Sequence, residues 1–191
     1  LDGGRCASRL SNCATIASAK CCARVAASSL PRTSNAASPT SCSVESSLAT
    51  IAAACSARTA GSSLPSVCNA AENLLIHRDI ANKALPEIAK ALIGEGVELR
   101  TDPQGKAILD TCDIESEIAQ DDDWGTEYLD LIISIKIVDS TEEAIAFINS
   151  YGSSHSDCIL TTDKEAAEKF LNGVDSATVY WNVSTRFTDG F

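Results

Sequence analysis

The sequence predicts an α/β fold with a mostly parallel sheet flanked by helices. Beyond residue 65, short apolar runs typical of buried strands alternate with helical patterns about ten residues long, most of them opened by a capping residue or stopped by glycine. Neighbouring parallel strands need crossover connections of this kind. Residues 1–64 lack the alternation, so we expect a low-complexity, poorly ordered segment ahead of an α/β domain at 65–191.

Composition narrows the class of protein. The chain has 191 residues, 45% of them apolar, which is enough for one sizeable core. Its net charge of -11 argues against nucleic acid or an anionic membrane as a partner. The most apolar stretch, 129–138, contains Asp130 and Lys136 and is too short to span a bilayer, and no secretory signal is visible. We therefore expect a soluble, cytoplasmic protein.

The first third differs from the rest in charge and composition. Residues 1–63 contain no aromatic side chain, and Asp2 and Glu45 are their only acids against six basic residues. Six of the nine cysteines lie there, without a CxxC pair or a Cys/His spacing, so we expect no metal site and reduced thiols. Two interpretations stay open: a poorly packed extension, or translation in the wrong frame, which the reading frame upstream of Pro65 would distinguish.

The pattern beyond residue 65 predicts individual elements. Asp121–Asp123 is expected to be a solvated turn, and Pro86 is expected in the first turn of its helix. Ser140 and Glu143 form a capping box, and Thr162 with Glu165 repeats that pattern. The expected strands are 73–77, 97–100, 129–138, 157–161 and 177–181, and the expected helices are 85–93, 104–109, 141–151 and 163–172.

Cys68 is the candidate nucleophile. Pro65 and Ser66 precede it and predict a short helix whose N-terminus would favour the reactive thiolate. Open parallel sheets bind ligands at the carboxyl ends of their strands. Three polar clusters are candidates for such a site: Cys68 with Asn69, residues 151–157, and residues 182–189.

Four segments in order resemble the gamma-glutamyl phosphate reductases, also called glutamate-5-semialdehyde dehydrogenases, of the aldehyde dehydrogenase superfamily. They read S-V-C-N-A-A-E-N-L-L-I-H-R-D, G-T-E-Y-L-D-L, A-I-A-F-I-N-S-Y-G-S-S-H-S-D and V-D-S-A-T-V-Y-W-N-V-S-T-R-F-T-D-G-F. The resemblance covers about residues 65–191. It implies that this part is a partial aldehyde-dehydrogenase-like catalytic domain.

The resemblance also implies a site and a reaction. Cys68 would be the nucleophile that takes the acyl group of gamma-glutamyl phosphate as a thioester, and NADPH would supply the hydride in this step of proline biosynthesis. Glu127 falls where the superfamily keeps a glutamate that hydrogen-bonds the nicotinamide ribose. Asn69, Ser184, Thr185 and Arg186 are the implied substrate contacts, since an arginine grips a carboxylate in two hydrogen bonds.

The resemblance leaves alternatives open. Nothing in residues 1–63 is similar to the nucleotide-binding portion of the family, and no G-x-G-x-x-G loop is present there. The chain is therefore expected to be a truncated reductase, a fragment of the C-terminal half of a bifunctional pyrroline-5-carboxylate synthase, or a catalytically silent association module. For the full-length enzyme, a homo-oligomer is expected.

Overall fold

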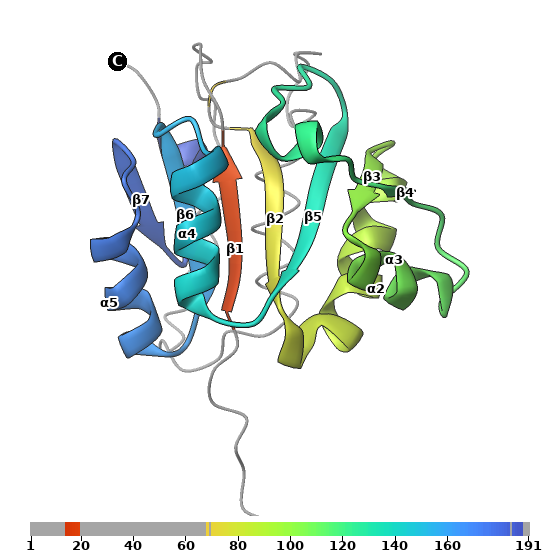
Figure 1. Cartoon of the computed structure of the whole chain (residues 1–191), viewed down its shortest axis with the longest axis horizontal. Helices are drawn as coiled ribbons and strands as arrows, with labels where there is room; N and C mark the ends of the chain where they lie inside the picture. The colour runs from red at the N-terminus through yellow and green to blue at the C-terminus, as the bar shows by residue number, and fades with distance from the viewer. Residues whose placement is uncertain (1–13, 20–67, 69, 184, 189–191) are drawn as a thin grey trace, which may run out of the picture.

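A computed structural model of the chain describes residues 14–19, 68, 70–183 and 185–188, with the backbone alone for 14–19 and Arg186. Its centre is a seven-stranded sheet in the order β4-β3-β5-β2-β1-β6-β7 (Figure 1). The strands are β1 (Ala14–Ala19), β2 (Ala71–His77), β3 (Glu98–Thr101), β4 (Glu117–Ile118), β5 (Ile132–Val138), β6 (Ser156–Thr161) and β7 (Thr178–Trp181).

Four α-helices and two short 3-10 helices connect the strands in the described part of the chain. The α-helices are α2 (Arg78–Gly94), α3 (Pro103–Asp110), α4 (Thr141–Tyr151) and α5 (Lys164–Gly173), and the 3-10 helices are η1 (Asp121–Gly125) and η2 (Thr185–Phe187). The alternation of strands and helices after residue 70 confirms the predicted α/β fold with its mostly parallel sheet.

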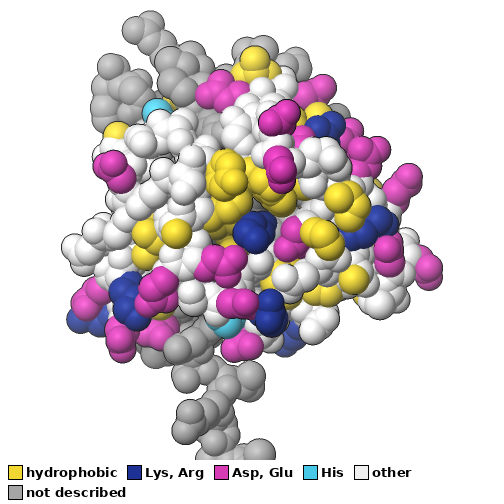
Figure 2. Space-filling view, viewed as in Figure 1, with side chains coloured by type: hydrophobic (Ala, Val, Ile, Leu, Met, Phe, Trp, Pro, Cys, Tyr) yellow, Lys and Arg dark blue, Asp and Glu magenta, His cyan; other side chains and the backbone are white. Residues whose placement is uncertain are grey.

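The helices cover both faces of the sheet because side chains alternate along each strand. Leu74 and Ile76 of β2 pack with buried residues of α2 and α3. Leu75, which lies between them, packs instead with α4 and α5 around the fully buried Phe170. In the view of Figure 1, α4 and α5 lie in front of the sheet. Figure 2 shows hydrophobic side chains gathered near the middle of that face, with acidic side chains around them.

Strand β1 comes from the segment for which the sequence predicted no element. It lies between β2 and β6 and is antiparallel to both, whereas the other described pairings are parallel. No periodicity identifies Ala14–Ala19 as a strand, because the run is short and its neighbours in the sheet are remote in sequence. The division of the chain at residue 64 stays a prediction.

A polar row crosses the sheet near the start of the parallel strands. Arg100 of β3 pairs with Ser134 of β5, and Ser134 pairs with Asn73 of β2. Ser18 of β1 then pairs with both Asn73 and Asp157 of β6. Paired residues share a face, and Ser134, Asn73 and Asp157 are buried there. Such a row needs hydrogen-bonding partners from whatever packs over it.

Several element boundaries differ from the prediction. Helix α2 begins at Arg78 rather than at 85, because the side chain of His77 accepts a hydrogen bond from the backbone N–H of Asp79. Pro86 therefore lies inside the helix, not in its first turn. Strand β5 begins at Ile132 rather than at 129, since Leu129 has a left-handed φ of 52°.

The two capping predictions have different outcomes. The Ser140 side chain caps α4 by accepting from the backbone N–H of Glu143, as predicted, while the Glu143 carboxylate accepts from the backbone N–H of Asp139. The prediction for Thr162 was wrong. Asp163 is the N-cap of α5 and accepts from the backbone N–H groups of Glu165 and Ala166.

Candidate functional site

Cys68 lies at the amino edge of the sheet, the edge at which the parallel strands begin. It is half-buried, in a turn three residues ahead of β2. Ala71 at the start of β2 pairs with Ala19, Ala19 with Ser156 at the start of β6, and Ser156 with Thr178 at the start of β7. The helix expected to begin beside Cys68 is not found in the described residues 68 and 70–77, which form a turn, a link and a strand.

The segment after β7 turns back to the same edge. Asn182 has a left-handed φ of 54°, and its side chain pairs with the backbone N–H and carbonyl of Thr161, each at 2.9 Å. The chain then passes through η2, and Thr188 Oγ1 reaches Thr178 Oγ1 at 3.2 Å and the Tyr180 hydroxyl at 3.0 Å. The segment that follows the carboxyl end of β7 is thereby attached to the amino end of the same strand.

The residues before β6 form the next part of the edge. The carbonyl of His155 accepts from the backbone N–H of Thr178 at 3.0 Å and from its hydroxyl at 3.2 Å. Ser176 Oγ donates to the buried Asp157 carboxylate at 2.5 Å. These bonds join the start of β6 to the start of β7 and hold this corner of the edge in place.

The described parts of the three predicted clusters therefore lie along one edge of the sheet, and it is not the edge of the carboxyl ends of the parallel strands. Cys68 precedes β2 and residues 152–155 precede β6, so both lie where parallel strands begin. Of the described residues in these clusters, only 182, 183 and 185–188 follow a strand, and Thr188 lies back at the start of β7. The expected carboxyl-end position was wrong, because it followed the general rule for open sheets and not the order in which these segments enter their strands.

Glu127 lies in the link between η1 and the start of β5, and that start belongs to the same edge as the start of β2. A cavity of about 20 Å³ beside the start of β5 is lined by Ala70 and Ala71 together with Asp130 and Leu131, and not by Glu127. That volume holds about one water molecule. Glu127 is exposed, and its carboxylate makes no hydrogen bond or ion pair with any residue that the structure describes.

The other predicted site residues are placed less completely. Thr185 is fully buried in η2, and its carbonyl accepts from the backbone N–H of Thr188. The backbone of Arg186 lies in the same turn. Asn69, Ser184 and the side chain of Arg186 lie outside the described part of the structure. Of the predicted substrate contacts, the structure thus places Thr185 and the backbone of Arg186, in the segment that Thr188 attaches to the amino edge.

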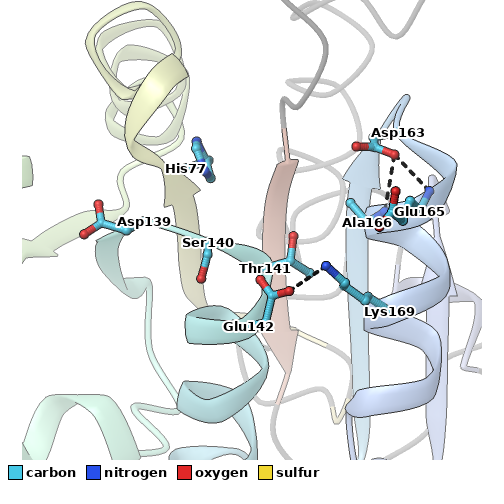
Figure 3. A pocket seen from close by; sticks show the side chains of 9 residues that line it. All are labelled: His77, Asp139, Ser140, Thr141, Glu142, Asp163, Glu165, Ala166 and Lys169. Atoms are coloured by element: carbon cyan, nitrogen blue, oxygen red, sulfur yellow. Dashed lines mark hydrogen bonds and ion pairs between the residues drawn. The ribbon is translucent and has the colours of Figure 1, made fainter.

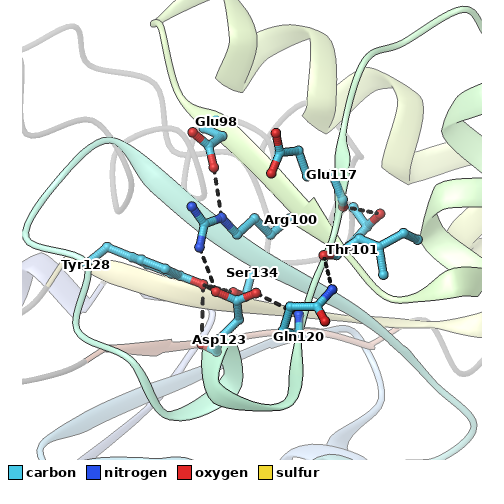
Figure 4. A network of polar contacts seen from close by, with 9 residues as sticks. Glu98, Arg100, Thr101, Glu117, Gln120, Asp123, Tyr128 and Ser134 are labelled. Atoms are coloured by element: carbon cyan, nitrogen blue, oxygen red, sulfur yellow. Dashed lines mark hydrogen bonds and ion pairs between the residues drawn. The ribbon is translucent and has the colours of Figure 1, made fainter.

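A part-buried ion pair joins Arg100 of β3 to Asp123 of η1 (Figure 4). Asp123, expected to be solvated, is 7% exposed, and Arg100 Nη1 donates to its Oδ1 at 2.7 Å. Burial alone would raise the pKa of Asp123, but hydrogen bonds from the Gln120 backbone N–H and from Arg100 hold that pKa below its ordinary value. The same bond to Asp123 raises the pKa of Arg100. The prediction failed because the partner comes from a strand 23 residues away.

Tyr128 completes this network, and the sequence analysis missed it. Its hydroxyl lies 2.8 Å from Asp123 Oδ1 and 2.7 Å from Ser134 Oγ. Arg100 lies over its ring at 5.0 Å. Burial, with the neighbouring Asp123, raises the pKa of Tyr128 to about 12. The tyrosine after the glutamate in the G-T-E-Y motif was the available signal, but nothing local shows which residues it reaches.

A larger pocket of about 270 Å³ lies at the opposite edge of the sheet (Figure 3). It is lined by His77, Asp139, Ser140, Thr141, Glu142, Asp163, Glu165, Ala166 and Lys169. Lys169 pairs with Glu142 at 2.7 Å, and Ser140 and Asp163 cap α4 and α5. Its lysine and both capping side chains are therefore already engaged, and it includes none of the predicted site residues.

Two further findings concern the described residues as a whole. No three His, Cys, Asp or Glu side chains among them are grouped closely enough to hold a metal ion. No helix in that part of the chain combines the length and hydropathy that crossing a membrane requires.

Comparison with known proteins identifies relatives of this arrangement. Residues 106–190 match the model of the aldehyde dehydrogenase family. Over 121 residues the chain is 54% identical to the gamma-glutamyl phosphate reductase of Caldicellulosiruptor bescii and 51% identical to that of Lacticaseibacillus casei. These matches cover 63% of this chain and 29% and 28% of the two relatives. The chain thus spans under a third of the length of the curated relatives it matches.

Among solved structures, two gamma-glutamyl phosphate reductases are similar to this chain. The gamma-glutamyl phosphate reductase of Thermotoga maritima superposes with a TM-score of 0.70 at 43% identity, over 77% of this chain and 33% of that one. The enzyme of the same name from Saccharomyces cerevisiae gives 0.52 at 38% identity, over 64% and 31%. The resemblance seen in the four sequence segments is confirmed.

Proposed function

We propose, from the aldehyde dehydrogenase superfamily to which this chain belongs, that it carries the cysteine-bearing part of a gamma-glutamyl phosphate reductase. The reaction proposed for the whole protein is the NADPH-dependent reduction of gamma-glutamyl phosphate to glutamate-5-semialdehyde. The observation that supports it most directly is the position of Cys68, half-buried at the edge where Glu127 and the 185–188 segment also lie.

Cys68 is the nucleophile in this proposal. Its thiolate attacks the acyl carbon, the bond between that carbon and the phosphate oxygen breaks, and inorganic phosphate leaves a thioester on Sγ. Among the described cysteines, Cys158 is buried in β6 and Cys112 is exposed after α3, so neither combines access with this edge. A thioester accepts hydride where a carboxylate does not, so covalent capture makes the reduction feasible.

A nicotinamide cofactor, when bound, supplies the hydride. Glu127 is the residue proposed to hold its ribose, since an acceptor-only carboxylate suits paired hydroxyls. The structure fits this role: the Glu127 side chain is exposed and makes no bond to a described residue. NADPH rather than NADH is part of the proposal.

The loop after β7 is proposed to hold the substrate. Arg186 would bind the carboxylate of the glutamyl group, while Asn69 and Ser184 would contact its polar atoms. Thr185 is included with them, and its full burial suits a residue that fixes the loop. Arg186→Ala is expected to raise KM for the acyl phosphate, and an unchanged KM would exclude this contact.

Acetyl phosphate, the simplest acyl phosphate, tests the nucleophile without a cofactor. The chain is incubated with it, and thioesters on each cysteine are counted by mass spectrometry. We expect labelling at Cys68 that exceeds labelling at the exposed Cys112 by about tenfold or more, and its loss in Cys68→Ala but not in Cys112→Ala. Equal labelling of the two thiols would refute the assignment.

The remaining parts of the proposal concern the whole protein. Its partner is a small-molecule substrate, it assembles as a homo-oligomer, and it works in the cytoplasm. A bifunctional parent protein and an association module without catalysis are the alternatives. Measurable NADPH affinity together with selective acylation of Cys68 supports the reductase over the association module.

A further inference from the structure

We infer that Tyr128, acting with Asp123, is a positioning residue that fixes the backbone of Glu127 for cofactor binding. The inference rests on the proposed function, because it takes Glu127 as the ribose contact. It concerns how a residue on a connecting segment, and not on a strand or helix, is held in one place.

The link that carries Glu127 is fastened on both sides. On its N-terminal side, Asn73 Nδ2 of β2 donates to the carbonyl of Trp124 at 3.5 Å. On its C-terminal side, the Tyr128 hydroxyl bonds Ser134 of β5 at 2.7 Å. Asn73 and Ser134 are paired neighbours on the same face of the sheet. Asn73 and Ser134, two adjacent positions of the sheet, therefore hold Trp124 and Tyr128, the residues on either side of 125–127.

The directions of the hydrogen bonds make this attachment specific. The Tyr128 hydroxyl has one proton, and the Asp123 carboxylate can only accept, so Tyr128 donates to Asp123. Ser134 must then donate to Tyr128. Asp123 also accepts from Arg100 at 2.7 Å and from the backbone N–H of Gln120 at 2.7 Å. The Tyr128 hydroxyl thus connects η1 to β5. Glu127 lies in the link between these two elements.

Glu127 differs from its neighbours in one respect. Asp123 and Tyr128 are held by several bonds, whereas Glu127 is exposed and is bonded to no residue that the structure describes. A fixed backbone beneath an unengaged carboxylate is the arrangement expected of a ligand contact that is ordered before the ligand arrives. The polar row across the sheet supplies the attachment points.

The first test uses the free chain and hydrogen exchange. Tyr128→Phe removes the hydroxyl and keeps the ring. Losing its bonds is expected to speed amide exchange in residues 126–131 by about tenfold, with little change in β6 and α5. Tyr151→Phe is the matched control, because the exposed Tyr151 packs against Phe147 through its ring and its hydroxyl makes no bond to a described residue. Unchanged exchange in Tyr128→Phe would overturn the positioning role.

The second test is a double-mutant cycle on NADPH affinity. Glu127→Gln and Tyr128→Phe are each expected to weaken NADPH binding by about tenfold, and the double variant to bind no more weakly than Glu127→Gln. Acylation of Cys68 by acetyl phosphate, which needs no cofactor, should be unchanged in Tyr128→Phe. A purely structural role would instead give additive losses in affinity and slower acylation, and would overturn the inference.

The outcomes separate this inference from the proposed function. If Glu127→Gln leaves NADPH affinity unchanged, or if the parent chain does not bind NADPH, the assignment of Glu127 fails and the inference fails with it. If Glu127→Gln weakens binding and Tyr128→Phe does not, the positioning role alone is wrong and the proposed function stands.

Discussion

The hydroxyl of Thr188 lies 3.0 Å from the phenol oxygen of Tyr180, and this contact returns the end of the described chain to the edge where Cys68 lies. Tyr180 belongs to β7, and Thr188 also reaches Thr178 at the start of that strand. The segment that the proposed function assigns to substrate binding is therefore attached along β7, the strand that precedes it in the chain.

Replacing Thr188 with valine should loosen this segment. The change removes the hydroxyl that meets Thr178 and Tyr180 and keeps the side-chain volume, at an expected cost of about 1 kcal/mol. Hydrogen exchange should rise in residues 183–188 and not in α5. Tyr180→Phe should give part of the same effect, while Thr162→Val, at an exposed position, should give none. Equal exchange in all four proteins would show that the hydroxyl does not hold the segment.

Tyr128 should make the fold sensitive to alkali. Its pKa rises from 10.0 to about 12 on folding, so below pH 10 both states keep the proton. Between about pH 10 and 12 the unfolded chain releases the proton first, and the free energy of unfolding falls as pH rises. Urea unfolding should show a shallower alkaline decline for Tyr128→Phe than for the parent chain. In Tyr151→Phe the free energy of unfolding should fall with pH as steeply as in the parent chain. An equally steep fall in Tyr128→Phe would contradict the raised pKa of Tyr128.

Asp123 should contribute stability that acid removes. Its pKa is lowered on folding, so the contribution is present above the ordinary aspartate pKa of 3.8 and is lost as pH falls through the folded value. Asp123→Asn is expected to destabilise the fold by about 2 kcal/mol at neutral pH, since it weakens the bonds to Arg100 and Gln120. The difference should shrink below about pH 4, which chemical denaturation would measure.

The neighbouring Asp122 provides the control for that prediction. It is exposed, and it takes part in the turn through its backbone carbonyl, which accepts a hydrogen bond from the Thr126 hydroxyl. Asp122→Asn should leave stability within about 0.5 kcal/mol of the parent. If both asparagine variants lost the same stability, the ion pair between Asp123 and Arg100 would contribute nothing measurable to the free energy of unfolding.

Gly152 should not tolerate a side chain. A Cβ added there would lie 2.5 Å from the carbonyl oxygen of Ile148, a backbone atom of α4 that cannot move independently. Its φ of -68° is open to any residue, so the expected loss of about 1–3 kcal/mol comes from the contact alone. Gly94→Ala is the matched control, because nothing lies within 4 Å and alanine favours the last turn of α2. Thermal unfolding of the two variants should shift in opposite directions.

Much of the fold could be predicted because it depends on neighbours in sequence. The apolar runs at 73–77 and 157–161 and the Ser140 cap gave the right elements, since periodicity and capping act within a few residues. The errors arose where a remote residue decides the outcome. Asp123 was expected in solvent and is buried because Arg100 reaches it from β3, and β1 completes the sheet without a pattern of its own.

The sequence by itself determined the α/β class, the order of the α-helices and longer strands after residue 70 but not β4 or the two 3-10 helices, and Cys68 as the candidate thiol. Only the tertiary structure decided at which edge of the sheet Cys68 lies, how Thr188 returns to that edge, and what holds the link bearing Glu127. These features depend on hydrogen bonds between residues far apart in the chain, such as Thr188 with Thr178 or Tyr128 with Ser134, and local preference does not specify such partners.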